Sequence, residues 1–538
     1  MGTRAWRTAP EIYWGGPIHT MAGGSAEAVI VDGTRIVFVG TEAQARNMAG
    51  IDANLRDLEG ACLLPGFVDA HTHPLMLGQS ASWVDVTGTT NMVELIEKLR
   101  RHADGLPPDA PIRGFGYEQD LLGRQPTADD LDQVSSGLPV TLMHRSGHGF
   151  VANHATLAEA GIDDATPAPD GGLIGRDPAG RLDGRVFDSA CDLLTGRDGV
   201  KITNHGPNFH LGDDPATLLT QLEAAQEIFL SFGITTVADM QVTAREMTSF
   251  LALHEQGRLK MRVTMMVLSS YLDQIEKLGL GRLGDGFLRL GGVKLYVDGS
   301  LSSGTAYMPT ECCGDEEHLY HPPPVYTELL GRAHRLGLQT ATHAQGPEAI
   351  RMVLDAVERA QSLWPGRKMR HRIEHCAFPT DPDVGRMKDL DVWPVSQPKQ
   401  VIQFAAGIIK NYGPIGERMY PYGSFKRQGV PIVLSSDAPV TVPDPMMAVW
   451  SAVTRQLDGG ETVGPDERID PASALAGYTI NGAAAIHRED KVGSIEVGKL
   501  ADFAVLDRDP FASPVDALPS ISVTKTIVGG STCWSRQT

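Results

Sequence analysis

Short apolar runs alternate with helical stretches through most of the chain, and this alternation constrains the fold more than any other feature. Asp214 and Pro215 supply an N-cap and a first helical residue, and the helix they open runs to about Phe232, where Gly233 can end it. The eight apolar runs are the one that ends at His71 and those at 234–238, 262–268, 292–297, 339–343, 370–375, 392–396 and 430–434. Repeated βα units with buried parallel strands predict an α/β fold, a (β/α)8 TIM barrel rather than an open sheet.

Strand-like runs also occur at both ends of the chain. Near the N-terminus, runs at 28–31 and 35–39 flank a hairpin signal of Asp, Gly and Thr. Near the C-terminus, similar runs occur at 493–495, 503–506 and 523–529. Because chain termini often lie close together, we expect the two ends to build one small β-sandwich domain.

A third region, from about 86 to 213, separates the first two barrel strands. It is rich in Gly, Asp and Pro, yet it contains a helix pattern at 92–102 and a strand pattern at 140–143. This region is too long for a loop, and we expect an inserted subdomain over the C-terminal face of the barrel. The predicted division is 1–62 and 488–538 for the β-sandwich, 63–85 for barrel strand one, 86–213 for the insert and 214–487 for the rest of the barrel.

The composition is that of a soluble globular protein, with 42% hydrophobic and 21% charged residues in a chain of 538. A net charge of −19 would repel nucleic acids and anionic membranes, so neither is an expected partner. The sequence has no apolar run long enough to span a membrane, and because residues 1–21 contain no apolar run either, we expect no signal peptide. The six cysteines are Cys62, Cys191, Cys312, Cys313, Cys376 and Cys533. Their irregular spacing favours free thiols in a reducing compartment, so we expect a cytoplasmic protein.

The first apolar run ends in two histidines one residue apart, His71 and His73. Residues i and i+2 of a strand point to the same face, so the pair would present two imidazoles side by side. Two neutral imidazoles at a strand end suit a borderline metal ion such as zinc, although two polar residues at a strand exit could equally be structural.

Four further polar residues stand at or near the ends of later runs, namely Lys294, His343, His375 and Asp437. Each has a structural alternative: a histidine can be a hydrogen-bonded scaffold residue, a lysine can reach out to solvent, and an aspartate can cap the next helix. Because catalytic residues of such barrels come from the C-terminal ends of several strands, the set as a whole predicts a metal site on that face.

Several longer segments carry a resemblance to a known family. They are 64–73 (LPGFVDAHTH), 294–306 (KLYVDGSLSSGTA), 371–375 (HRIEH), 435–440 (SSDAPV), 493–507 (GSIEVGKLADFAVLD) and, in the insert, 145–148 (RSGH) followed by Asn153 and Leu157. The chain resembles the amidohydrolase superfamily over nearly its whole length. Within it, the chain is most similar to amidohydrolase family 3, the YtcJ-like branch that includes N-substituted formamide deformylases.

The resemblance implies a metal-dependent hydrolase that cleaves an amide-type C–N bond, N-acyl or N-formyl, of a small molecule. It implies two divalent ions, zinc by its donor set, with His71, His73 and Asp437 on one ion and His343 and His375 on the other. Lys294, carboxylated by CO2, would bridge both ions, and a bridging hydroxide would be the nucleophile. Asp437 would accept the proton of that water and pass it to the departing amine. The resemblance also implies a homodimer.

Weaker expectations concern residues outside this set. His148 of the insert is a candidate to polarise the scissile carbonyl, and Tyr117, Glu118 and Tyr296 are candidate substrate contacts. Two positions depart from what we expect. Asp188 stands where the family pattern has glutamate. Cys376 directly follows His375, and we interpret it as a small buried residue.

Three other functions remain open at this point. A deaminase of the same fold would place a glutamate three residues after the strand-five histidine, but Gly346 occupies that position here. A cyclic-amide hydrolase would use the same metal centre as an amidase. A catalytically inactive relative acting as a binding or regulatory scaffold would typically have lost ligands, whereas this chain keeps all six candidates.

Overall fold

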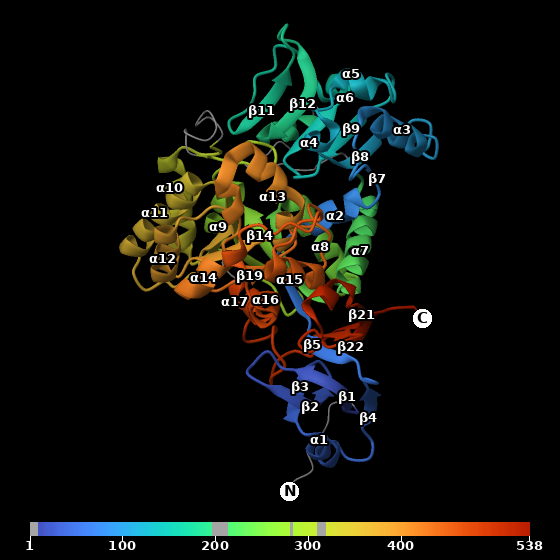
Figure 1. Cartoon of the computed structure of the whole chain (residues 1–538), viewed down its shortest axis with the longest axis vertical. Coiled ribbons are helices and arrows are strands. Elements are labelled where there is room, and N and C mark those ends of the chain that lie inside the picture. The colour runs from blue at the N-terminus through green and yellow to red at the C-terminus, as the bar shows by residue number, and fades with distance from the viewer. Residues whose placement is uncertain (1–8, 196–212, 280–282, 309–318, 538) are drawn as a thin grey trace.

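The computed structural model describes residues 9–195, 213–279, 283–308 and 319–537, and it contains three β-rich parts in a row (Figure 1). A sheet built from both chain ends lies at the bottom of the view, the barrel in the middle and the inserted sheet at the top. The last part of the predicted insert (196–212), residues 1–8, Cys312 and Cys313 lie outside the described residues.

The middle part is the predicted barrel, an eight-stranded parallel sheet. In spatial order its strands are β6 (Phe67–Thr72), β13 (Ile234–Val242), β14 (Arg262–Leu268), β15 (Leu288–Tyr296), β16 (Gln339–Ala344), β17 (Arg372–His375), β18 (Trp393–Ser396) and β19 (Val433–Leu434). β19 is shorter than the predicted run at 430–434, in which Pro431 has no N–H to donate to a ladder. This sheet confirms the α/β barrel class.

Backbone hydrogen bonds between β6 and the loop after β19 bring the two ends of the sheet together. The Asp437 N–H donates to the His71 carbonyl (2.9 Å), and the His73 N–H donates to the Ala438 carbonyl (2.9 Å). Inside the barrel, small and medium apolar side chains form a core of their own, among them Val68, Ala238, Met266, Ala341 and Val395. The barrel interior is therefore packed rather than open, and the free space lies at the strand ends.

Helices cover the outside of the barrel and occupy the connections (Figure 1). They are α1 (Glu42–Ala49), α2 (Pro74–Ser80), α3 (Met92–Ala103), α4 (Gln119–Leu122), α5 (Ala128–Asp132), α6 (His154–Ala160), α7 (Pro215–Ser231), α8 (Ala244–Glu255), α9 (Leu272–Leu278), α10 (Pro323–Leu336), α11 (Pro347–Leu363), α12 (Asp381–Leu390), α13 (Pro398–Tyr412), α14 (Tyr422–Gln428), α15 (Pro445–Thr454), α16 (Pro471–Gly477) and α17 (Ile480–Ala485). The predicted cap of α7 is present, since the Asp214 carboxylate accepts from the N–H groups of Ala216 and Thr217.

The two chain ends meet in one sheet, as predicted. Its strands are β1 (Glu11–His19), β2 (Ser25–Asp32), β3 (Arg35–Gly40), β4 (Asn54–Asp57), β5 (Cys62–Pro65), β20 (Phe503–Leu506), β21 (Val523–Val528) and β22 (Ser531–Ser535). β5 and β20 join the ends in antiparallel register, with Leu64 opposite Ala504. The strand predicted at 493–495 was wrong: Gly493 has φ +87°, and the segment makes a single backbone bond, from the Ile495 N–H to Thr20.

The insert forms a separate six-stranded sheet. Its strands are β7 (Val84–Asp85), β8 (Ile112–Tyr117), β9 (Val140–His144), β10 (Gly149–Ala152), β11 (Gly172–Arg176) and β12 (Leu182–Asp188). The helix predicted at 92–102 is α3, and the strand predicted at 140–143 is β9. This sheet follows β6 in the chain and lies beyond one end of the barrel (Figure 1). In the described part of the chain, no helix is both long enough and apolar enough to cross a bilayer.

Candidate metal and active site

Six polar side chains predicted from the strand ends line one small cavity at the C-terminal end of the barrel strands. They are His71 of β6, His73 at the start of α2, Lys294 of β15, His343 of β16, His375 of β17 and Asp437 in the loop after β19. All six are buried. The ring centroids of His343 and His375 are 4.5 Å apart, and those of His71 and His375 are 5.0 Å apart, so the imidazoles gather around one point of the cavity.

Asp437 completes a tight group with the two histidines of the first strand. Its Oδ1 lies 3.4 Å from His71 Nε2 and 3.3 Å from His73 Nε2. Burial raises the pKa of Asp437, but the hydrogen bond from His73 and the charge of His375 outweigh burial and hold it below its usual range. Three groups of donor residues in the described part of the chain are close enough to hold an ion, and only this one is buried throughout.

Three of the four imidazoles have a hydrogen-bond partner on the side away from the cavity. The pairs are His71 Nδ1 with Glu374 Oε2 (2.6 Å), His375 Nδ1 with Gln397 Oε1 (2.8 Å) and His343 Nε2 with the Gly299 carbonyl (3.0 Å). Each acceptor holds the ring proton on that nitrogen and leaves the other nitrogen with a lone pair. Metal-binding histidines in proteins use this arrangement.

Burial shifts the site toward its neutral, electron-donating forms. It is the main cause that lowers the pKa of His71 and of His343 well below the usual histidine value, and that of His375 to about 4. The amine of Lys294 is fully buried and its pKa is lowered to about 8, again because burial disfavours the ammonium form. In their neutral forms the imidazoles and the amine have lone pairs that can bind a metal ion.

The backbone at the site is strained. His375, Cys376 and Asp437 have φ values of +66°, +54° and +58°, in the left-handed region that non-glycine residues rarely adopt. Such residues cluster at functional sites, where the surrounding structure holds them in place. Cys376 itself is fully buried in the core around the barrel and does not line the cavity, in agreement with its interpretation as a packing residue.

The insert contributes His148, from the loop between β9 and β10, to the same cavity. Its ring lies 5.1 Å from that of His343. Its Nδ1 lies 2.7 Å from Asp188 Oδ1, and the Tyr320 hydroxyl donates to that same oxygen (2.8 Å). The aspartate that departs from the family pattern therefore contacts His148.

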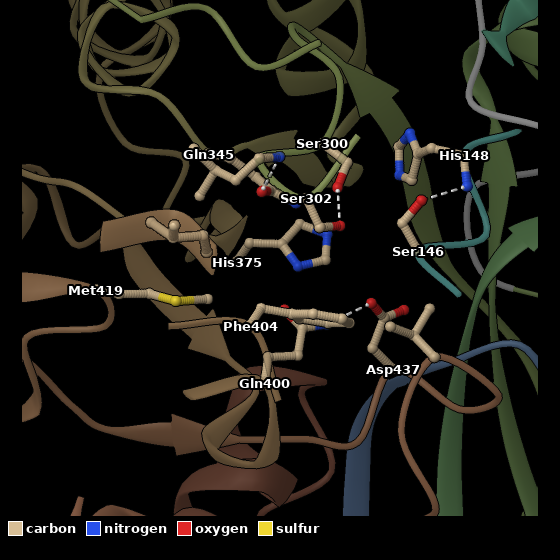
Figure 2. Close-up of a pocket in the computed structure, with 13 residues that line it drawn as sticks. Ser146, His148, Ser300, Ser302, Gln345, His375, Gln400, Phe404, Met419 and Asp437 are labelled. Carbon is tan, nitrogen blue, oxygen red and sulfur yellow. Dashed lines mark hydrogen bonds between the residues drawn. The ribbon is translucent and has the colours of Figure 1, made fainter. Parts of the chain in front are cut away.

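A second cavity adjoins the first (Figure 2), and the two share Ser146, His148, His375, Asp437 and Val440. Its polar wall includes Ser146, Ser300, Ser302, Gln345 and Gln400, and its apolar wall is Leu301, Phe404, Ile408, Met419 and Val440. Gln400 Nε2 donates to Asp437 Oδ2 (3.0 Å) at the boundary between the two cavities. The space beside Asp437 thus combines a polar side with an apolar side.

The three predicted substrate contacts lie in different places. Tyr296 lines the first cavity, where its ring stacks on that of His343 with 5.2 Å between centroids. Tyr117 is buried in the core of the insert, and Glu118 lies 3.6 Å from Arg145. The structure does not place Tyr117 or Glu118 among the residues that line either cavity.

The sequence interpretation missed several residues that hold the site together. Glu374, between Arg372 and His375, binds both the His71 ring and the Arg372 guanidinium. A buried Arg-x-Glu-His run at a strand end is a signal that could have indicated it. Gln397 and Gln400 come directly after the C-terminal end of β18, just as the predicted ligands stand at the C-terminal ends of other barrel strands. At the end of β13, Gln241 lines the same cavity as the predicted ligands, and Asp239 lies beside it.

A parallel barrel whose C-terminal face carries buried imidazoles, a carboxylate and a lysine around one cavity defines the class of metal-dependent barrel hydrolases. The family model described as "Amidohydrolase family" matches residues 54–533. The chain belongs to this amidohydrolase family and is an enzyme, a metal-dependent hydrolase acting on C–N bonds.

Individual relatives resemble the chain over almost its full length. It is 31% identical to an N-substituted formamide deformylase of Arthrobacter pascens, with 95% of each chain covered. It is 27% identical to the putative amidohydrolase YtcJ of Bacillus subtilis, over 98% of this chain and 99% of the relative. A crystal structure of an uncharacterized metal-dependent hydrolase from Pyrococcus furiosus superposes with a TM-score of 0.73 at 30% identity, covering 93% of this chain and 99% of that one.

Proposed function

We propose that this enzyme hydrolyses the amide C–N bond of a small N-acyl or N-formyl amide and uses two zinc ions to do so. His71, His73 and Asp437 would hold one ion, His343 and His375 the other, and carboxylated Lys294 would bridge them. The observation that carries the proposal is the gathering of all six side chains, buried, around one cavity.

The donor set fits such ions. The imidazoles keep lone pairs directed away from their Glu374, Gln397 and Gly299 partners, as zinc ligands require. Lys294 is buried, and among the described residues it forms no ion pair with a carboxylate; its Nζ lies 4.6 Å from the centroid of the Tyr296 ring. A buried amine without a carboxylate partner is costly as an ammonium, and in its neutral form it can add CO2 to give a carbamate with two oxygen donors.

The bound metal ions supply a Lewis acid and a water of lowered pKa. Asp437 is placed to move the proton: one carboxylate oxygen faces His71 and His73, and Gln400 binds the other. We assign it the role of accepting the proton of the attacking water and giving it to the leaving amine.

His148 is our candidate for stabilising the charge that develops on the substrate carbonyl oxygen. It borders both cavities and comes from the insert rather than from a barrel strand. Asp188 accepts the Nδ1 proton, so Nε2 is the nitrogen left for the substrate. A donor fixed in advance in a buried site stabilises a developing oxyanion at little reorganisation cost.

The second cavity supports an N-substituted amide as the substrate class. Its apolar wall, formed by Leu301, Phe404 and Ile408 among others, lies beside Asp437, where the leaving amine would depart. An apolar N-substituent would contact this wall, with Ser302 and Gln345 on the polar side, and the free volume of about 20 Å³ means that the wall has to open to admit it. The similarity to a protein named N-substituted formamide deformylase agrees with this substrate class.

Deamination is disfavoured by the backbone at Gly346. A Cβ atom there would lie 1.9 Å from the Tyr307 carbonyl oxygen, so no side chain fits at the position where a deaminase of this fold carries its glutamate. A cyclic-amide hydrolase would use the same metal centre, and a comparison of linear and cyclic amides as substrates distinguishes the two activities. A catalytically inactive scaffold has no need of the six candidate metal ligands, so their gathering around one cavity disfavours that function.

The test is elemental analysis of the purified protein combined with hydrolysis of N-substituted formamides, linear acyl amides and cyclic amides. We expect about two zinc ions per chain and turnover of linear N-substituted amides. One ion per chain with release of ammonia from an aminated ring would indicate a deaminase, and turnover of cyclic amides alone would indicate the cyclic-amide hydrolase. Absence of both metal and turnover would indicate the scaffold. Gel filtration and cell fractionation test the expected homodimer and cytoplasmic location.

A further inference from the structure

Two buried polar atoms near the candidate metal centre lack a hydrogen-bond partner among the described residues, His73 Nδ1 and Asp239 Oδ2. Both belong to deeply buried residues, with exposed fractions of 9% for His73 and 2% for Asp239. An unsatisfied buried polar atom costs about 1–3 kcal/mol, so two of them next to a functional centre require an explanation.

Both residues border the same small cavity, which lies between β13 and α2 and adjoins the first cavity, with which it shares His73, Met76 and Gln241. Its volume is about 20 Å³. A water molecule needs a free volume of about 10–15 Å³, so the cavity has room for one. The rest of the lining is Leu75, Met76, Gln241, Arg245 and Glu246.

The neighbouring charged groups are engaged elsewhere. Glu246 accepts from the Thr243 N–H (2.9 Å) and from Arg245 Nε (2.8 Å), which closes the start of α8. Asp239 Oδ1 accepts from the Gln241 N–H at 3.2 Å. This leaves Oδ2 of Asp239 as the acceptor that faces the cavity without a protein donor.

His73 is the exception among the four histidines of the centre. His71, His343 and His375 each have an acceptor on the nitrogen that faces away from the cavity. The Nε2 of His73 faces Asp437, so its Nδ1 is the nitrogen that needs an acceptor, and no described residue supplies one. In this structure Nε2 donates to Asp437, so the tautomer that offers an Nε2 lone pair to a metal ion needs an acceptor for the Nδ1 proton.

We propose that one buried water occupies this cavity, accepts the Nδ1–H of His73 and donates to Oδ2 of Asp239. Asp239 is then the positioning residue that sets the tautomer and orientation of His73 through the water. The inference rests on the proposed role of His73 as a metal ligand and adds a residue from β13 to the support of the centre. It gives all four histidines an outer acceptor, three directly from the protein and one through water.

The test measures the zinc affinity of the metal-free protein by competition with a chromophoric chelator, so that no substrate is needed. Asp239→Leu, which keeps the branching of the side chain and removes its oxygens, should weaken zinc binding by about 10- to 100-fold. Asp239→Asn keeps a polar group that can bind the water, so its zinc affinity should fall less than that of Asp239→Leu. Thr236→Val is the matched control, because it removes another unpartnered buried oxygen of β13 that does not border this cavity, and it should bind zinc as the wild type does.

Wild-type zinc affinity in Asp239→Leu would overturn the inference, as would a high-resolution crystal structure of the wild type without a water between His73 and Asp239. The crystal structure also covers the case in which the leucine variant does not fold. His73→Ala separates this inference from the proposed function: if that variant binds zinc as the wild type does, His73 is not a ligand and the proposed metal site itself is wrong. Loss of zinc in His73→Ala with normal binding in Asp239→Leu removes only the role of Asp239.

Discussion

His148 and Asp188 form a hydrogen-bonded pair within the insert, with 2.7 Å between Nδ1 of the imidazole and Oδ1 of the carboxylate. The Tyr320 hydroxyl donates to the same oxygen from a different part of the chain. The carboxylate fixes which nitrogen of His148 carries the proton that faces away from the cavity. A side chain of the insert is thereby held over a centre that the barrel builds.

His148→Ala should lower kcat by about 10²- to 10³-fold, the usual cost of removing one donor to a developing oxyanion, and should leave the zinc content unchanged. Asp188→Ala should cause a smaller loss, because the ring remains but its orientation is no longer held. Steady-state kinetics and elemental analysis of the same preparations check this. Unchanged kcat in His148→Ala would remove the insert from the chemistry.

Asp437→Asn tests the proton-transfer role. The amide has almost the same shape as the carboxylate, and its oxygen can still accept from Gln400 or face the histidines, so most of the metal should stay bound. It cannot accept a proton at neutral pH, so kcat should fall by about 10²- to 10⁴-fold. Near-normal turnover with full metal content would show that another group is the base.

Lys294 has a matched control in Lys399, since burial lowers the pKa of both amines to about 8. Lys399 donates to the Val442 carbonyl and does not line the cavity of the metal centre. Lys294→Met should lose much of the bound zinc, whereas Lys399→Met should keep it. Equal zinc content in the two variants would contradict the carbamate bridge.

Reconstitution of the metal-free wild type gives a second test of Lys294. Only the neutral amine can add CO2, and the pKa of about 8 means that the ammonium form increases as the pH falls through that value. At a fixed concentration of dissolved CO2, zinc uptake should therefore slow as the pH is lowered from 9 to 7, and it should slow at every pH when CO2 is removed. Uptake independent of CO2 would exclude carboxylation.

The barrel could be predicted because its signals are local. Asp214, Pro215 and Gly233 mark the two ends of α7 by the chemistry of their own side chains and backbone. β22 was missed because Ser531–Ser535 is a short, largely polar edge strand, and such a strand shows no apolar alternation. The error at 493–495 has a similar origin: the segment contains one apolar residue that is buried by tertiary contacts, and one buried residue does not make a strand.

The candidate ligands could be predicted because parallel strands bring their C-terminal ends to one face. Their outer partners could not, because those contacts join distant positions: Glu374 meets His71 across 303 residues of sequence. The Asp188 contact depends on the pairing of β10 with β12 in the insert, which the pattern of either strand does not specify. Tyr117 and Glu118 show the same limit, because the end of β8 gives no indication of whether a side chain faces the barrel or the core of the insert.

His371, directly before β17, and His334 of α10 form a buried chain of hydrogen bonds. The Thr340 N–H donates to His371 Nδ1 (3.1 Å), and His371 Nε2 lies 2.8 Å from His334 Nδ1. Because Nδ1 of His371 accepts from a backbone N–H, a proton there would break that bond. Burial, followed by the charge of His334, lowers the pKa of His371 to about 3.

This pair predicts how stability depends on pH. Between pH 6.5, the usual histidine value, and about 3, the unfolded chain binds a proton at His371 and the folded protein does not. Unfolding therefore takes up a proton, and the free energy of unfolding falls as the pH is lowered, by up to about 1.4 kcal/mol per pH unit from this residue. His371→Gln should lower stability at pH 7 but give a shallower dependence below pH 6.5 than the wild type shows. Denaturant unfolding at a series of pH values measures both slopes, and equal slopes for the wild type and His371→Gln would show that His371 takes up its proton in the folded protein as well.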